Sequence, residues 1–311
     1  MTAQPPDWFT AALAAPAGDG IVEVAGARIS YRAWGPAGAP GVVLVHGTAA
    51  HARWWDHIAP FLQGSTSGEG ASPDGGLRVA ALSMSGHGDS DWRDHYSIDQ
   101  WAAEVMAVAA AAQIAGPPVI IGHSLGGGVA LATAGRYGGA LAGIVVIDTT
   151  VYEGPPPPEM STPEMGFGTG RTYPSREAII ARFRLVPEQP VLPYIREYIA
   201  AWSVADRGNG EWGWKFDQSL FTKMTPQAPS AAQPAGCRVT ILRAQHGMMS
   251  PEMADRLRGR LGQRAPVVEI PAAGHHVLLD EPLSLVTALR TVLAGWTAQE
   301  PRDSAAVEER C

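Results

Sequence analysis

The chain has 311 residues, 46% of them hydrophobic, which is enough for one sizeable core or a core with a smaller attached unit. Its formal net charge of -7 argues against nucleic acid or an anionic membrane as the main partner. The two cysteines, Cys237 and Cys311, lie far apart and indicate no disulfide framework. The first 20 residues lack a leader pattern and no run of about 20 apolar residues occurs, so the expected location is the cytoplasm.

Short apolar runs rich in β-branched residues alternate along the chain with longer helical patterns. We predict strands at residues 21–24, 28–34, 42–45, 78–82, 119–121, 143–147, 238–242 and 267–270. We predict helices at residues 51–62, 98–113, 126–137, 251–261 and 282–296. This alternation indicates an α/β fold with a mostly parallel sheet and helices on both of its faces.

Two segments interrupt the alternation. Residues 63–76 are rich in glycine and serine and are typical of a flexible surface insertion. Residues 152–236 open with Pro155–Pro158 and contain helical runs at 175–185 and 193–202, a pattern that favours a helical cap between two sheet strands. We therefore expect a core from 1–150 and 237–297, a cap at 151–236 and a disordered tail at 298–311.

The pentapeptide Gly122-His123-Ser124-Leu125-Gly126 follows an apolar strand and precedes a helix of small residues. A Gly-x-Ser-x-Gly pattern in this setting is typical of a nucleophile elbow, a sharp turn that holds a serine in a strained backbone conformation. Its hydroxyl would stand above the sheet at a helix N-terminus, which favours developing negative charge. The pattern predicts Ser124 as a nucleophile.

A serine hydroxyl needs a base to accept its proton. Gly274-His275-His276 follows the last predicted strand, and loops at the carboxyl ends of parallel strands meet at one edge of the sheet. Adjacent side chains should point in different directions, so only one histidine can serve. We favour His275, which follows a flexible glycine, and expect His276 to pack beside it.

The base needs an orienting acid. The loop at 243–251, a common place for it, contains no Asp or Glu before Glu252. The alternative place is the end of the strand that follows the nucleophile helix, where Asp148 stands. By elimination the sequence favours Asp148, with Glu252 as the competing candidate.

Two backbone N–H groups should stabilise the oxyanion of a tetrahedral intermediate. Leu125 follows the nucleophile and would provide one of them. Thr48, in the loop His46-Gly47-Thr48-Ala49 after a predicted strand, would provide the other. We expect His46 to support this loop by hydrogen bonding rather than to act as a base.

With these residues the chain resembles the α/β-hydrolase family. The matching motifs are His46-Gly47, Ser85-Gly86-His87-Gly88-Asp89-Ser90, the pentapeptide around Ser124 and Ala273-Gly274-His275, in the family's order. The resemblance implies an eight-stranded sheet, a cap after the sixth strand, Ser124 as nucleophile, His275 as base, and Leu125 with Thr48 as oxyanion donors. The chain departs from the family pattern at Ser83, where an aspartate is frequent, and in the loop that lacks the usual late acid.

The expected activity is hydrolysis of a small to medium carboxylic ester through an acyl-enzyme, without metal or organic cofactor. A lactonase, a thioesterase or a carbon–carbon bond hydrolase would carry the same motifs. A cofactor-free dioxygenase and a non-catalytic ligand receptor on the same fold remain as alternatives.

The tryptophans are the strongest sequence pointers to a substrate pocket. Trp54 and Trp55 follow the oxyanion loop, and Trp202, Trp212 and Trp214 lie in the expected cap. Each could equally pack the structure together. The expected partner is a small-molecule ester or related acyl compound, and the sequence does not indicate an oligomeric state.

Overall fold

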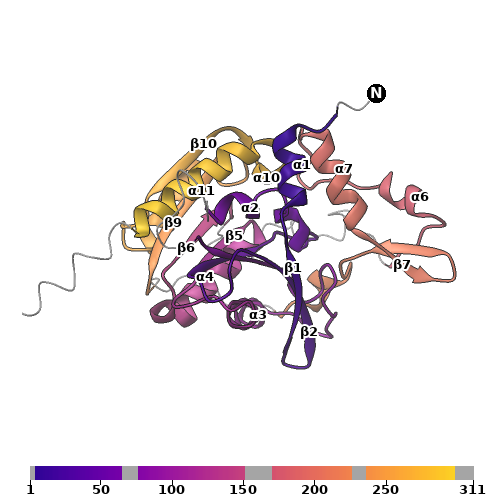
Figure 1. The fold of residues 1–311 in the computed structure, drawn as a ribbon, viewed down its shortest axis with the longest axis horizontal. Coiled ribbons are helices and arrows are strands. Elements are labelled where there is room, and N and C mark those ends of the chain that lie inside the picture. The colour runs from indigo at the N-terminus through magenta and orange to yellow at the C-terminus, as the bar shows by residue number, and fades with distance from the viewer. Residues whose placement is uncertain (1–3, 65–75, 151–169, 226–235, 298–311) are drawn as a thin grey trace, which may run out of the picture.

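The computed structural model describes residues 4–64, 76–150, 170–225 and 236–297. Eight strands form its central sheet in the spatial order β1-β2-β4-β3-β5-β6-β9-β10 (Figure 1). Their bounds are β1 Gly18–Val24, β2 Ala27–Trp34, β3 Gly41–Val45, β4 Arg78–Leu82, β5 Val119–His123, β6 Gly143–Ile147, β9 Arg238–His246 and β10 Val267–Gly274. Only β2 runs against its neighbours, β1 and β4. The mostly parallel sheet expected from the sequence is confirmed.

Both faces of the central strands are covered. Every residue of β3, β5 and β6 is buried, as expected for parallel strands between two helical layers. Along β3, Val42 and Leu44 pack in one apolar cluster, whereas Val43 and Val45 pack in another. This alternation follows from the two-residue period of a strand, and it divides the core into two layers.

Helices from distant parts of the chain form these layers (Figure 1). The cluster around Val43 contains residues of α3 (Ile98–Ala111), α4 (Leu125–Tyr137) and α9 (Pro251–Arg260). The cluster around Val42 contains residues of α1 (Asp7–Ala14), α2 (Ala59–Leu62), α7 (Pro193–Trp202), α10 (Val277–Asp280) and α11 (Pro282–Thr297). The carboxyl ends of β3, β5, β6, β9 and β10 consequently share one edge of the sheet.

The predicted helix at 51–62 is wrong as a continuous element. The structure has a 3-10 turn, η1 (Ala52–Trp55), followed by the single α-helical turn of α2. Pro60 lies in the first turn of α2 and has no N–H to donate to residue 56, so a helix cannot run through this point. The apolar pattern therefore reflected burial rather than a regular helix.

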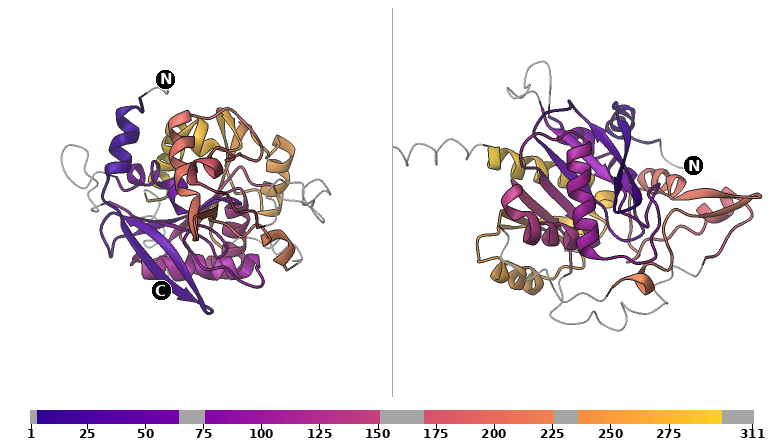
Figure 2. Two further views of the ribbon diagram at one scale, coloured as in Figure 1. Left: turned by 90° about the vertical axis from the view of Figure 1, so that its right-hand side faces the viewer. Right: turned by 90° about the horizontal axis from the view of Figure 1, so that it is seen from below.

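The segment at 170–225 contains more than the helices predicted for it. It forms α6 (Arg176–Ile180), α7, α8 (Leu220–Lys223) and an antiparallel hairpin of β7 (Val204–Gly208) and β8 (Glu211–Trp214). The turn between the strands carries Asn209 and Gly210, both with positive φ. Asn-Gly is a strong hairpin signal, so this pair could have predicted the hairpin. The hairpin projects away from the sheet (Figure 2).

Three expectations fall outside the described residues: the Gly/Ser insertion at 65–75, the Pro155–Pro158 run and the tail at 298–311. Within the described part of the chain, no helix is long and apolar enough to cross a bilayer.

Buried histidines make the fold sensitive to acid. Burial lowers the pKa of six of them, namely His46, His51, His57, His87, His123 and His276. Between pH 6.5 and the lower native pKa values, the unfolded chain binds protons that the native chain does not, so stability falls as pH falls. Burial raises the pKa of Asp56, Glu104 and Asp280, which opposes this trend at the lower end.

His57 provides the test. Its Nε2 donates to the Leu278 carbonyl at 2.7 Å, and burial lowers its pKa to about 4. Replacing one such group should flatten the slope of unfolding free energy against pH between 6.5 and 4 by up to about 1.4 kcal/mol per pH unit. Urea unfolding of His57→Gln at several pH values measures this slope. The exposed His95→Gln serves as control, and equal slopes in all three proteins would contradict the expectation.

Candidate active site

Ser124 lies on a sharp turn between β5 and α4, with φ 55 and ψ -120. Such a conformation costs a non-glycine residue about 1–3 kcal/mol, so the surroundings must enforce it. They do so by close packing: a Cβ on Gly122 would lie 2.0 Å from the Gly126 carbonyl oxygen, and one on Gly126 would lie 2.4 Å from the Val45 oxygen. The two glycines of the motif therefore allow the turn itself.

Thr149 braces the same turn and was not anticipated from the sequence. Its Oγ1 donates to the Ser124 carbonyl oxygen at 2.9 Å. A Cβ on Gly127 would lie 1.9 Å from that Oγ1, so the start of α4 requires glycine here as well. The strand end after β6 thus supports the turn that carries Ser124.

His275 follows β10 and faces Ser124. Its Nε2 lies 3.0 Å from Ser124 Oγ, and its Nδ1 lies 2.7 Å from Asp148 Oδ2. Because a carboxylate can only accept, Nδ1 carries the ring hydrogen and Nε2 is free to accept from the serine hydroxyl. The structure therefore brings Ser124, His275 and Asp148 into one hydrogen-bonded chain.

The carboxylate of Asp148 is fully buried and is held by a backbone cradle. It accepts hydrogen bonds from the N–H groups of Met248 at 2.7 Å, Ala244 at 3.2 Å and Met249 at 3.3 Å. A Cβ on Gly247 would lie 2.3 Å from both carboxylate oxygens, so only glycine lets the loop close around them. The loop after β9 thus carries no acid of its own and instead binds the acid from β6.

Glu252, the competing candidate, has a different partner. Its Oε2 accepts a hydrogen bond from Ser250 Oγ at 2.7 Å on the exposed first turn of α9. This arrangement stabilises the helix start and leaves Asp148 as the described carboxylate bonded to His275.

The second histidine of the pair points away from Ser124, as expected. His276 Nε2 lies 3.2 Å from the Pro187 carbonyl oxygen, and the His276 ring lies 5.9 Å from that of Trp54. His123, inside the nucleophile motif, donates from Nε2 to the His275 carbonyl oxygen at 2.7 Å. The backbone of the base is therefore held by the residue that precedes the nucleophile.

Gln189 is a further contact that the sequence did not indicate. Its Oε1 accepts from the His276 N–H at 2.9 Å, and its Nε2 donates to Asp280 Oδ2 at 2.7 Å. The same Asp280 oxygen accepts from the Gly274 N–H at 2.6 Å. A segment between α6 and α7 thereby holds the loop of the base from the side opposite the sheet.

The loop after β3 lies against the nucleophile. A Cβ on Gly47 would lie 3.1 Å from Ser124 Cβ, so the backbone passes close to the site. Thr48 follows, half-buried, and Leu125 opens α4, where its N–H has no acceptor within the helix. Both predicted oxyanion donors thus lie on segments that border Ser124.

His46 ties this loop to the one after β4. Its Nε2 accepts from the Met84 N–H at 3.1 Å, and its Nδ1 donates to the Gly47 carbonyl oxygen at 2.7 Å. Burial lowers the pKa of His46 well below its usual value, which keeps the ring neutral and suited to this pair of bonds. The role fits the support expected from the sequence.

Apart from Trp54, the predicted pocket tryptophans lie in different environments. Trp55 is fully buried in the core and has no surface to offer a substrate. Trp202 is 39% exposed and has the Arg53 guanidinium 3.7 Å from its ring centre. Trp212 and Trp214 both lie on β8, where they are half-buried.

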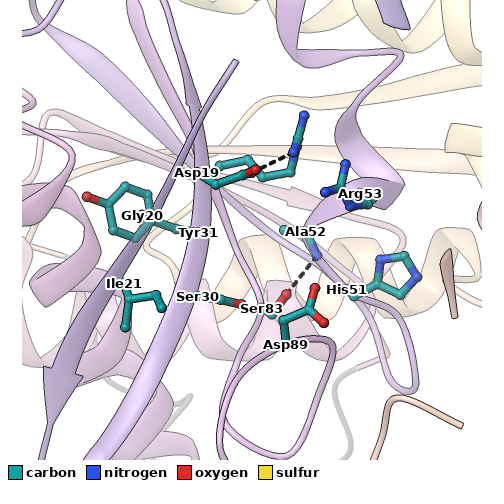
Figure 3. A pocket seen from close by; sticks show the side chains of 11 residues that line it. Asp19, Gly20, Ile21, Ser30, Tyr31, His51, Ala52, Arg53, Ser83 and Asp89 are labelled. Atoms are coloured by element: carbon teal, nitrogen blue, oxygen red, sulfur yellow. Dashed lines mark hydrogen bonds and ion pairs between the residues drawn. The ribbon is translucent and has the colours of Figure 1, made fainter. Parts of the chain in front are cut away.

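A cavity of about 420 Å³ lies beside η1, between the β1–β2 hairpin and the loop after β4 (Figure 3). Its charged side chains already have partners, since Arg32 binds Asp19 at 2.6 Å and Lys215 binds Asp89 at 2.6 Å. None of the three triad residues lines it. We therefore do not assign the catalytic site to this cavity.

Comparison with known proteins defines the class. The sequence profile described as the alpha/beta hydrolase family matches residues 42–289, which is most of the chain. The protein therefore belongs to the alpha/beta hydrolase family.

Two curated relatives come from Mycobacterium tuberculosis. Esterase Rv0045c is 25% identical over 285 residues, covering 88% of this chain and 89% of the esterase. Lipase LipV is 35% identical over 120 residues, but the match covers 38% of this chain and only 40% of the lipase. Relatives with these names support a hydrolase of ester bonds.

Solved structures share the fold at low identity. A crystal structure of esterase Rv0045c has a TM-score of 0.68 at 22% identity, covering 94% of this chain and 99% of that one. The structure of E-2-(acetamidomethylene)succinate hydrolase has a TM-score of 0.72 at 17% identity, covering 90% and 100%. At these identities the likeness concerns the fold alone.

The cradle around Asp148 yields a prediction. In Gly247→Ala, the new methyl group should displace the carboxylate from His275, and misplacement by about 1 Å can cost on the order of 10²-fold in rate. Gly259→Ala is the matched control, since its Cβ would meet nothing closer than 3.6 Å. Steady-state kinetics with a chromogenic ester compares the two. Wild-type turnover in a folded Gly247→Ala protein would contradict the importance of this cradle.

Proposed function

We propose that the protein hydrolyses small to medium carboxylic esters, with Ser124 as nucleophile, His275 as general base and Asp148 as the acid that orients it. The observation that carries this proposal is the continuous hydrogen-bonded chain, 3.0 Å from Ser124 to His275 and 2.7 Å from His275 to Asp148. Spacing of this kind is what proton transfer from a serine hydroxyl requires. The esterase and lipase names among the relatives add support.

Acylation would begin when Ser124 Oγ attacks the ester carbonyl carbon. Its proton passes to His275 Nε2, and the C–O double bond becomes the oxyanion of a tetrahedral intermediate. The Thr48 and Leu125 N–H groups would donate to this oxyanion. His275 then returns the proton to the departing alcohol oxygen, and an acyl-enzyme remains on Ser124.

Deacylation repeats the sequence with water as the nucleophile. His275 accepts a proton from the water as its oxygen attacks the acyl carbon. Collapse of the second tetrahedral intermediate breaks the bond to Ser124 Oγ, which recovers the proton from His275. The carboxylic acid leaves, and the chain's own side chains and backbone carry every step.

Asp148 would act through the imidazole. Its carboxylate accepts from Nδ1, which selects the tautomer with a free Nε2 and stabilises the imidazolium formed in each half-reaction. The three backbone N–H groups around it keep the carboxylate charged and fixed, so it need not reorganise during the reaction.

The substrate class is narrower than the chemistry. Trp54 borders His276 and is our candidate for a wall of the acyl or alcohol pocket, with Trp202, Trp212 and Trp214 as candidates from the proposed cap at 151–236. Lactones and thioesters would react by the same steps. The cytoplasmic location expected from the sequence stays a prediction.

The first test is turnover of p-nitrophenyl esters from acetate to decanoate. Removing the nucleophile in Ser124→Ala should reduce turnover by several orders of magnitude, because only binding and oxyanion stabilisation remain. The chain length of best kcat/KM measures the pocket.

Near-wild-type turnover by Ser124→Ala would refute the nucleophile assignment. Absence of turnover by the wild-type protein on every ester, lactone and thioester would favour carbon–carbon cleavage, a cofactor-free dioxygenase or a ligand receptor instead.

The acid is tested by a pair of amide substitutions. Asp148→Asn should lower kcat about 10⁴-fold, because the amide N–H can force the wrong imidazole tautomer. Glu252→Gln changes an exposed carboxylate bonded to Ser250 and should leave kcat within about twofold. Both rates come from the same ester assay with circular dichroism as a check of folding. A larger loss in Glu252→Gln than in Asp148→Asn would move the acid to residue 252.

A further inference from the structure

Three histidines meet at the site, although ester hydrolysis needs only one. A ring nitrogen from each of His123, His275 and His276 lies within 4.8 Å of those of the other two. The His275 ring centre lies 4.9 Å from that of His123 and 5.0 Å from that of His276. All three side chains are buried. The surplus of imidazoles calls for a separate explanation.

Each ring has one nitrogen engaged with an acceptor. His123 Nε2 donates to the His275 carbonyl oxygen, and His276 Nε2 faces the Pro187 carbonyl oxygen. His275 Nδ1 donates to Asp148. The opposite nitrogens, Nδ1 of His123, Nδ1 of His276 and Nε2 of His275, therefore keep their lone pairs. Metal-binding histidines have this pattern, in which a carbonyl or carboxylate holds the other ring N–H.

His276 supplies an independent sign of a ligand. Its Nδ1 is buried and has no hydrogen-bond partner among the described residues, and only 6% of the residue is exposed. A buried acceptor without a partner is costly, and an apolar ring would fill the same space without that cost. Gln189 and Pro187 fix the residue from the other side, so the unpartnered nitrogen is held in place.

The charge state of the cluster also suits a cation. Burial and the neighbouring imidazoles lower the pKa of His123 well below its usual value and that of His276 to about 3. Both rings are neutral at pH 7, so a metal ion would displace no proton from them. Asp148 lies behind His275 and places a negative charge near the bound cation.

We propose that the cluster of His123, His275 and His276 binds a divalent transition-metal ion of the Zn²⁺ or Cu²⁺ class and that this ion inhibits the enzyme. The inhibition follows because the ion occupies the His275 Nε2 lone pair that must accept the Ser124 proton. Imidazole ligands favour these ions, whereas Mg²⁺ and Ca²⁺ prefer oxygen. The inhibitory part rests on the proposed function, and the binding part does not.

Coordination requires a small closure of the cluster. Zinc–nitrogen bonds of about 2.0–2.1 Å place tetrahedral ligand nitrogens about 3.4 Å apart. The upper separation of 4.8 Å therefore has to shrink by about an ångström, which side-chain rotation can supply. His276 and His123 distinguish this site from a lone catalytic histidine, which would bind such ions only weakly.

The test compares wild type with His276→Gln and His95→Gln. Glutamine at 276 can keep the N–H that faces Pro187 but has no equivalent of the free Nδ1, and His95 is an exposed control. ZnCl₂ should inhibit wild type and His95→Gln equally, with full recovery in EDTA and no inhibition by MgCl₂. His276→Gln should keep its activity in EDTA and require at least about 10-fold more zinc.

Binding is measured separately so that the two proposals can fail independently. Co²⁺ added to Ser124→Ala, which retains all three histidines, should give the visible absorption of a tetrahedral nitrogen-bound ion at one ion per chain. The same spectrum should be absent when His276→Gln is added to that variant. An unchanged spectrum and unchanged zinc inhibition in His276→Gln would overturn the proposal. Cobalt binding in a protein that cleaves no ester would overturn only the proposed function.

Discussion

The site depends on the hydrogen bonds that fix the Asp148 carboxylate. Asp148 ends β6, and its oxygens are bonded by His275 Nδ1 and by three backbone N–H groups of the loop after β9. A buried carboxylate without such partners would be unstable as an anion. This cradle joins β6, β9 and β10 at the sheet edge, where the elbow with Ser124 also ends. The parallel sheet and the proposed chemistry therefore share one electrostatic requirement.

Much of the fold could be predicted from local patterns. The buried strands β3, β5 and β6 are short β-branched runs, and Ser97 caps α3 at the predicted place by accepting from the Gln100 N–H. The elbow was readable because its glycines are required sterically, at positions where any Cβ would strike backbone. Residues whose identity is dictated by space leave a clear signal in a single sequence.

Contacts made by backbone groups were not predictable in this way. Any residue can offer an N–H to Asp148, so the cradle leaves a trace only at Gly247. The interrupted helix at 51–62 failed because burial on many sides imitates helical periodicity until a proline intervenes. Trp55 illustrates the same limit: composition indicates an aromatic residue near the site, but only packing reveals that it is fully buried. Gln189 acts from a distant segment that no spacing rule connects to His275.

The central claim is that His275, held by Asp148, activates Ser124. It is tested most directly by intact-mass and peptide mapping after reaction with a fluorophosphonate, which labels activated serines. The account predicts one adduct per chain, located on Ser124, with labelling slowed by orders of magnitude in His275→Gln. An adduct on another residue, or equal labelling rates in both proteins, would contradict it.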